Sequence, residues 1–239
     1  MLNRLDIFTE KTDLGDVYSD LSVKIHGFLM NSIQPEYAAE LHKDSVRPFS
    51  IYTVEGKNGY ITRISTLDER AVALIDALEG VERIHVVGTK DDLKVTNVYR
   101  YPEITADELV AGFDFDKCAV NIITPAIYKV NGRPKHNPSI IKYFDAVLQK
   151  LSKYEEIAVP TSRLTLAFNK TDFGKYELFT APFLSGGSIH YGLCGKAELF
   201  LPPDEDGIIM KTVLAYATYC GFGGNTAQGM GGFSVEKIG

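Results

Sequence analysis

The chain has 239 residues, of which 45% are hydrophobic, and its formal net charge is −6. That length suits two small domains of roughly 100 to 120 residues each, with enough apolar side chains for a sizeable core. No run approaches the ~18 apolar residues of a membrane span, and the first residues lack the basic start and apolar stretch of a secretory signal. We therefore expect a soluble, cytoplasmic protein that does not contact a membrane.

The negative charge is unevenly spread along the chain. Residues 67–116 hold twelve Asp and Glu against five Lys and Arg, a local balance of −7 that leaves +1 for the remainder. Residues 117–144 contain five Lys and Arg and no acidic residue. An acidic face and a separate neutral to basic face would permit a polyanion to bind. The alternative is an ordinary acidic protein in which the charges cluster by accident.

The first half predicts a ferredoxin-like domain. Alternation or helical spacing of apolar residues indicates a strand, two helices, two strands, a helix and two further strands. In chain order these span residues 2–10, 18–33, a short helix starting near 35, 49–54, 60–65, 67–79, 83–87 and 93–99. The order strand, helix, strand, strand, helix, strand is that of the split βαβ arrangement.

The second half reads in the same way. We expect helices at residues 139–151 and 207–220. Strands are expected at residues 118–124, 163–169, 176–183, 189–201 and 233–238. Residues 124–139 are rich in turn formers and basic residues, which predicts an irregular surface loop. The fold class is therefore α+β, with tandem ferredoxin-like (RRM-like) domains. Each is an antiparallel sheet with helices on one face, and the domains span residues 1–105 and 106–239.

The three cysteines do not indicate metal chemistry. Cys118, Cys194 and Cys220 are odd in number and widely spaced, and no CxxC or Cys/His ligand spacing occurs. Buried, reduced thiols are expected rather than a disulfide framework or a zinc site. We predict no metal and no cofactor.

A glycine-rich loop near the C-terminus is the most distinctive stretch. Residues 221–232, GFGGNTAQGMGG, contain six glycines, follow a predicted helix and precede a predicted strand. A P-loop or a dinucleotide fingerprint needs the reverse order, because the phosphate must lie on a helix N-terminus. Loop amides and the side chains of Asn225, Thr226 and Gln228 could instead surround an anionic backbone. A connector without a ligand is the alternative.

This loop, with its flanking helix and strand, resembles the C-terminus of the CRISPR-associated repeat-cleaving endoribonucleases, the Cas-six family of the RAMP group of RNA-binding proteins. Residues 21–54 are similar to the family's first helix, its Leu-His and its Pro-Phe-Ser strand, and residues 121–151 resemble its Thr-Pro segment, basic loop and helix. The resemblance implies tandem ferredoxin-like domains and metal-independent cutting of CRISPR precursor RNA (pre-crRNA) within its repeats. CRISPR repeat RNA is then the main partner, with CRISPR effector-complex subunits or a second copy of the chain as further partners.

Metal-independent RNA cleavage uses the neighbouring 2′-hydroxyl as nucleophile and leaves a 2′,3′-cyclic phosphate and a 5′-hydroxyl. The protein must move two protons and stabilise charge on phosphorus, and an imidazole is well suited to proton transfer near neutral pH. His42 matches the family's catalytic histidine by motif. Arg47 matches a family lysine that supports the transition state, and its guanidinium could clamp two phosphate oxygens. Without the resemblance, His42 reads as a histidine that satisfies carbonyls at a helix C-terminus.

Two positions depart from the family pattern. Met30 stands where the resemblance places an active-site tyrosine. His26 lies one helical turn earlier, so we hypothesise that it fills part of the missing catalytic role, with Tyr37 as a weaker candidate. A half-buried helix histidine is the alternative for His26. Asn225 replaces a frequent loop lysine, which predicts weaker and less salt-dependent RNA binding.

The predicted RNA-binding residues come from the basic loops and the glycine loop. They are Lys43, Lys129, Arg133, Lys135, His136, Gly223, Gly224, Asn225, Thr226, Gln228, Gly229 and Gly231. Two other functions stay open at this point. One is a non-catalytic RAMP subunit that binds guide RNA, and the other is a small-molecule-binding protein of the same fold.

Overall fold

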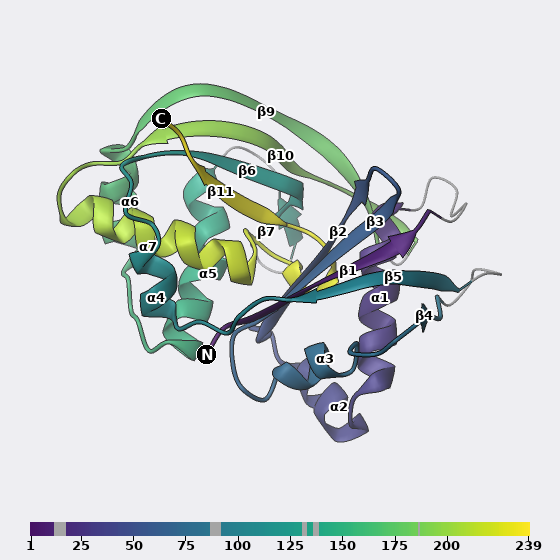
Figure 1. Cartoon of the computed structure of the whole chain (residues 1–239). Coiled ribbons are helices and arrows are strands. Elements are labelled where there is room, and N and C mark those ends of the chain that lie inside the picture. The colour runs from purple at the N-terminus through teal and green to yellow at the C-terminus, as the bar shows by residue number, and fades with distance from the viewer. Residues whose placement is uncertain (12–17, 87–91, 131–132, 136–138, 186) are drawn as a thin grey trace.

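The computed structural model describes residues 1–11, 18–86, 92–130, 133–135, 139–185 and 187–239 (Figure 1). Within these ranges, no helix is both long and apolar enough to cross a membrane. The chain forms two antiparallel sheets, and helices cover one face of each.

The first sheet is built around β1 (Asn3–Glu10). Its strand order is β2-β3-β1-β5-β4, with bounds Phe49–Gly56 for β2, Gly59–Thr66 for β3, Arg83–Ile84 for β4 and Leu93–Arg100 for β5. Three helices cover one face, namely α1 (Tyr18–Ser32), α2 (Pro35–Lys43) and α3 (Val72–Asp76). Because strand side chains alternate, Leu5 and Ile7 point towards α1 and bury against Leu21, Ile25 and Leu29.

The second sheet is built around β6 (Lys117–Ala126). Its order is β11-β6-β10-β9, with bounds Asp172–Ser185 for β9, Ser188–Phe200 for β10 and Phe233–Lys237 for β11. The helices of this half are α4 (Ala106–Ala111), α5 (Ile140–Tyr154), α6 (Thr161–Asn169) and α7 (Glu205–Cys220). Leaving aside the short β4, each sheet has the ferredoxin-like order in which the first strand lies between the last and the third. The predicted fold class is confirmed.

Three element predictions were wrong. Residues 163–169 form helix α6 rather than a strand, because Pro160 precedes the first turn and Leu164 and Ala167 bury against neighbouring helices. The expected irregular loop at 124–139 contains a small hairpin, β7 (Tyr128–Val130) with β8 (Arg133–Lys135). The helix expected at 67–79 is reduced to the five residues of α3, flanked by turns. The predicted domain boundary at 105/106 falls at the start of α4 and stays a prediction.

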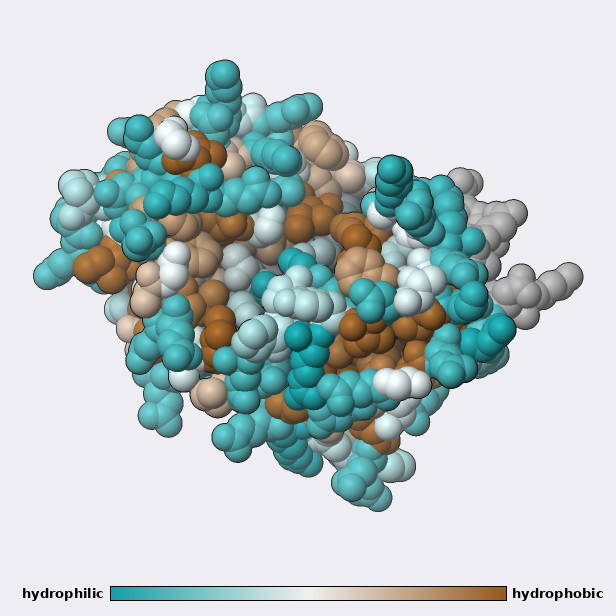
Figure 2. Space-filling model, viewed as in Figure 1, coloured by the Kyte–Doolittle hydropathy of each residue, from teal (hydrophilic) through white to brown (hydrophobic). Residues whose placement is uncertain are grey.

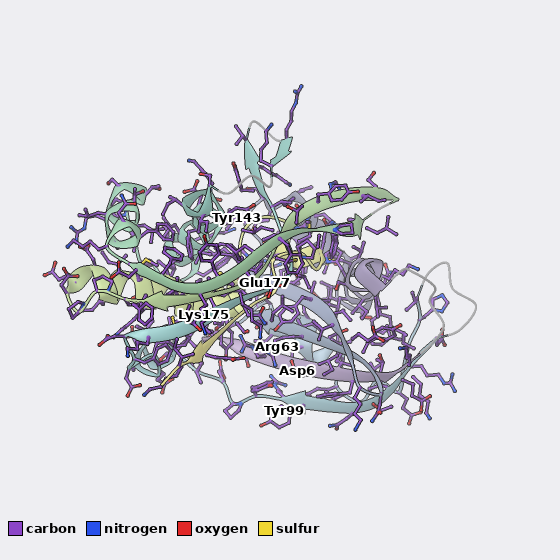
Figure 3. The ribbon with its side chains drawn as sticks, turned by 90° about the horizontal axis from the view of Figure 1, so that it is seen from above. Asp6, Arg63, Tyr99, Tyr143, Lys175 and Glu177 are labelled. Atoms are coloured by element: carbon purple, nitrogen blue, oxygen red, sulfur yellow. The ribbon has the colours of Figure 1, made fainter. Side chains whose placement is uncertain are left out.

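The two halves meet where the uncovered face of the first sheet touches the end of α7. Arg63 forms a two-pronged ion pair with Asp6, with Nε 2.8 Å from Oδ1 and Nη2 2.7 Å from Oδ2, and the two side chains lie together in Figure 3. Beside them, Arg4 donates to the Thr218 carbonyl at 2.5 Å, and Ser50 donates to the Tyr219 carbonyl at 2.5 Å. Figure 2 shows apolar side chains gathered towards the middle of the molecule, with hydrophilic ones around them. These contacts fix where the loop after α7 lies.

Candidate functional site

A cleft of about 610 Å³ lies between the two halves of the molecule. One wall is the C-terminal end of α2 with the loop that follows it, residues 42–47. The opposite wall combines the start of the β7 hairpin, the middle of α5 and residues 223–228 of the glycine loop. Segments about 180 residues apart in the chain therefore share one cleft, which the fold alone brings together.

His42 occupies the wall that belongs to the first half. Helix α2 begins at Pro35, which suits a first helical turn, and buries Tyr37, Ala38 and Leu41 against the core. This burial turns the next residue outward, so the His42 ring is exposed and lines the cleft. The first half thus presents an accessible imidazole to the cleft that the glycine loop also lines.

His26 lies behind His42 rather than in the cleft. Its side chain is only 6% exposed, its ring stacks on Phe49 with centroids 5.8 Å apart, and it meets the His42 ring edge-on at 6.0 Å. Burial, with smaller contributions from the nearby Arg47 and His42, lowers the pKa of His26 to about 4, although a hydrogen bond with the Ala227 backbone acts in the opposite direction. The ring is therefore neutral at pH 7.

This position changes the interpretation of His26. Met30, where the family tyrosine was expected, is also buried, at 7% exposure. Neither side chain lines the cleft, so neither is placed to act there in the role of the missing tyrosine. The Nδ1 atom of His26 is buried and has no hydrogen-bond partner among the described residues. The hypothesis that His26 transfers a proton directly finds no geometric support, and its contact with the His42 ring indicates an orienting role instead.

The buried His26 predicts an acid-sensitive fold. Its folded pKa of about 4 lies below the ordinary 6.5, so between these values the unfolded chain binds a proton that the folded chain does not. Stability therefore falls as the pH drops from 6.5 to 4, by roughly 3 kcal/mol in total. Urea unfolding at pH 4, 5, 6 and 7 should show a shallower loss for His26→Gln than for the wild type. His85→Gln, at an exposed site, should keep the wild-type slope, and equal slopes for all three proteins would contradict the assignment.

Arg47 is the second cleft residue of the first half. It is half-buried, and its Nε donates to the Leu41 carbonyl at 3.0 Å, which ties the side chain to the end of α2. Burial lowers the pKa of Arg47 and Asp44 raises it. A guanidinium titrates far above neutral pH, so Arg47 enters the cleft as a fixed positive charge beside His42.

Two residues of the second half hold the loop that carries Arg47. Lys153, near the end of α5, donates to Asp44 Oδ2 at 2.5 Å and to the Val46 carbonyl at 3.0 Å. The hydroxyl of Tyr154 donates to the same Val46 carbonyl. The position of Arg47 therefore depends on a helix that lies more than 100 residues further along the chain.

Loss of the Tyr154 hydroxyl is expected to weaken this connection. Tyr154→Phe removes one donor to the Val46 carbonyl and should lower the free energy of unfolding by roughly 1 kcal/mol. Urea titration of the purified variant measures the change. Tyr176→Phe is the matched control, because Tyr176 is 69% exposed on β9. A Tyr154→Phe midpoint equal to that of the control would show that the bond contributes nothing.

The glycine loop forms the facing wall, and its backbone amides are largely used within the protein. The amides of Gly223 and Gly224 donate to the carbonyls of Tyr143 at 3.1 Å and Ile127 at 2.7 Å, and the amide of Gly231 donates to Pro125 at 3.1 Å. Gly229 and Gly231 are buried and are not part of the cleft lining. The predicted cradle of amides is thus not available at these glycines.

The surplus of positive charge in the cleft comes from side chains. Five cations line it: Lys43, Arg47, Lys129, Lys142 and Lys150. The acids in its lining are Asp44, which pairs with Lys153, and Asp145, which pairs with Lys142 at 3.3 Å. Of the other predicted RNA contacts, Arg133 and Lys135 are exposed on β8 outside the cleft, and His136 lies outside the described residues. The arrangement attracts an anion although the chain as a whole is acidic.

Sequence reasoning missed Lys150, although the sequence contains a signal for it. The buried stripe of α5 comprises Tyr143, Phe144, Val147, Leu148 and Leu151. Lys150 lies seven residues after Tyr143 and therefore points to the same side of the helix. A lysine on an apolar stripe is unusual, so the pattern predicts a buried charged side chain and a candidate functional residue. Among the described residues, no group of three or more His, Cys, Asp or Glu is placed to hold a metal ion.

Comparison with known proteins finds similarity to Cas6 endoribonucleases. The model of the CRISPR-associated endoribonuclease Cas6 family matches residues 120–233. A Cas6 endoribonuclease of Streptococcus thermophilus is 25% identical over 229 residues, covering 91% of this chain and 92% of the relative. One of Mycobacterium tuberculosis is 24% identical over 227 residues, covering 91% of this chain and 72% of the relative. A solved Cas6 product complex superposes with a TM-score of 0.79 at 19% identity, covering 99% of this chain and 100% of that chain. The resemblance indicated by the sequence is confirmed.

Proposed function

We propose, from its match to the Cas6 family, that this chain is an endoribonuclease that cleaves CRISPR precursor RNA within its repeats, at the cleft between its two halves. The observation that supports this most directly is the exposed His42 ring facing residues 223–228 across a cleft lined by five cations. Phosphodiester cleavage needs a group that exchanges protons near neutral pH and fixed positive charge beside it, and the cleft supplies both.

The reaction that fits this geometry is an internal transesterification. The 2′-hydroxyl of the nucleotide before the cut loses its proton as its oxygen bonds to phosphorus, and the bond from phosphorus to the 5′-oxygen breaks. That oxygen takes up a proton, which leaves a 2′,3′-cyclic phosphate and a 5′-hydroxyl. His42 carries out one of the two proton transfers, and Arg47 stabilises the charge on the phosphoryl oxygens.

His26 supports this reaction indirectly. Because its ring is neutral and meets the His42 ring edge-on at 6.0 Å, it restricts the directions that the catalytic imidazole can take without adding charge next to it. RNA binding draws on Lys43 and Lys129, both exposed, and on the side chains of Asn225 and Gln228 in the loop.

Incubation with repeat RNA in EDTA tests the proposal. Discrete cleavage in the absence of free divalent ions, with a 2′,3′-cyclic phosphate on the upstream product, supports the metal-independent reaction. Cleavage that requires added Mg²⁺, or a 3′-hydroxyl product, would contradict the mechanism. The end group is read by treating the product with a phosphatase before and after acid opening of the cyclic phosphate.

A second function is favoured by one observation, the absence of the family tyrosine. With Met30 and His26 buried, His42 is the one histidine among the described residues that lines the cleft. A non-catalytic RAMP subunit that retains guide RNA would need only the cations and the loop. The EDTA incubation separates the two functions, since the binder returns intact RNA in complex with the protein. Association with effector-complex subunits or with a second copy of the chain is a further prediction, which light scattering with and without RNA measures.

A further inference from the structure

The floor of the cleft contains a buried ammonium group, that of Lys150. Its side chain is 6% exposed and lines the cleft from the inner side of α5. The Nζ atom donates to the carbonyl of Cys220 at 2.7 Å and to Thr226 Oγ1 at 2.7 Å. One lysine therefore joins α5, the last residue of α7 and the glycine loop.

The two partners of Lys150 are neutral oxygens. Burial of an ammonium is unfavourable unless a negative charge offsets it. The Cys220 carbonyl belongs to the C-terminal turn of α7, where unpaired carbonyls and the helix dipole attract a cation, and this gives partial compensation. Among the described residues, no carboxylate pairs with Lys150, and Asp145 on the same helix pairs with Lys142 instead. Burial and the neighbouring Arg47 lower the pKa of Lys150.

An anion in the cleft would complete this arrangement. The loop amides at Gly223 and Gly224 are bonded to the Tyr143 and Ile127 carbonyls, so the loop cannot offer them to a phosphate. At these two glycines positive charge is supplied by side chains instead, and Lys150 lies against the loop through its bond to Thr226. Its charge acts at short range through protein rather than through water, which makes it stronger than that of an exposed lysine.

We propose that Lys150 is a positioning residue of the cleft, which fixes Thr226 and the glycine loop against α5 and keeps a positive charge with no carboxylate partner beside the bound RNA phosphate. This inference rests on the proposed RNA-binding function of the cleft. In this inference, the attraction of the RNA phosphate near the glycine loop comes from the Lys150 ammonium rather than from the amides of the loop glycines. A helix cap without a role in binding would use the same two hydrogen bonds, so the two roles must be separated by binding measurements.

The test compares Lys150→Met, Lys150→Gln and Lys150→Arg with the wild type. The ligand is repeat RNA carrying a 2′-deoxy sugar at the cleavage position, titrated over a range of salt concentrations. Lys150→Met and Lys150→Gln should lose roughly tenfold in affinity at low salt. The slope of log K against log salt should decrease by about 0.7, the value for one phosphate contact on a single strand. Lys150→Arg keeps the charge and should keep the slope.

Lys211→Met serves as the matched control, because Lys211 lies on α7, pairs with Asp116 at 2.8 Å and is not part of the cleft lining. Thermal unfolding without RNA reports the capping role separately. Lys150→Gln retains donors for the Cys220 and Thr226 oxygens, so it tests the charge even if the methionine variant does not fold. A folded Lys150→Gln protein with wild-type affinity and salt slope would overturn the proposal, whatever its melting temperature.

The outcome for Lys150 is distinguishable from that for the nuclease. If the wild-type protein binds repeat RNA without cutting it, the catalytic function is excluded, but the binding test of Lys150 still applies. If the wild type does not bind repeat RNA, stabilisation by inorganic phosphate tests the same charge. Phosphate should then raise the melting temperature of the wild type more than that of Lys150→Gln, and equal shifts would overturn the inference.

Discussion

Replacement of His42 by Ala is expected to slow cleavage of repeat RNA roughly 10²- to 10⁴-fold, the usual effect of removing a general acid or base. The side chain is exposed at the end of α2, so its loss leaves no buried cavity and should change the stability of the fold little. Binding should persist, because the cations of the cleft and the glycine loop are unchanged. Single-turnover cleavage at saturating protein isolates the chemical step from affinity.

A matched variant makes the result specific. His85→Ala removes an imidazole that is also solvent-exposed, next to Asp92 and outside the cleft, and should cleave as fast as the wild type. His42→Ala is expected to bind the 2′-deoxy repeat RNA within about threefold of the wild type, since exposed groups seldom contribute more than a few tenths of a kcal/mol to affinity. Undiminished cleavage by His42→Ala would exclude this residue from the mechanism and leave RNA retention as the function of the cleft.

The position of His42 at the end of a short helix could be predicted because it depends on local sequence. A proline at the start of a short helix and apolar residues on its inner side set which way residue 42 faces, and both are visible in the chain. The same holds for the helix before the glycine loop and for Gly221, which ends that helix with a φ of 78° as predicted. Local rules of spacing and capping sufficed in these places.

Other features depend on contacts between distant residues, which no local pattern reveals. The amides of Gly223 and Gly224 were expected to bind phosphate, but their partners are carbonyls of Tyr143 and Ile127, roughly 80 to 100 residues earlier in the chain. His26 had the helical spacing of a cleft residue, yet burial beside Phe49 removes it from the cleft. Helix α6 was predicted as a strand because threonine and phenylalanine also suit strands, and packing between helices decided the outcome.

The predicted consequence of this internal bonding is that one glycine of the loop tolerates no side chain while its neighbour does. Gly223 has a φ of 86°, and a Cβ built there would lie 2.3 Å from the Ile127 carbonyl oxygen. At Gly224 the nearest atom, the same oxygen, would lie 3.6 Å from a Cβ, which is an ordinary contact. Gly223→Ala must therefore both adopt a left-handed backbone conformation and displace the chain of residue 127.

Gly223→Ala should lower the free energy of unfolding by roughly 2 to 4 kcal/mol, from left-handed strain together with the steric overlap. Gly224→Ala should remain within about 0.5 kcal/mol of the wild type. Urea unfolding of the two variants, read side by side, gives the comparison. Because the strained loop would also release Thr226 from Lys150, Gly223→Ala should lose at least tenfold in RNA affinity when measured well below its unfolding midpoint. Equal stabilities of the two alanine variants would show that the glycine loop is a flexible connector. The proposal that the cleft depends on a fixed conformation of this loop would then be wrong.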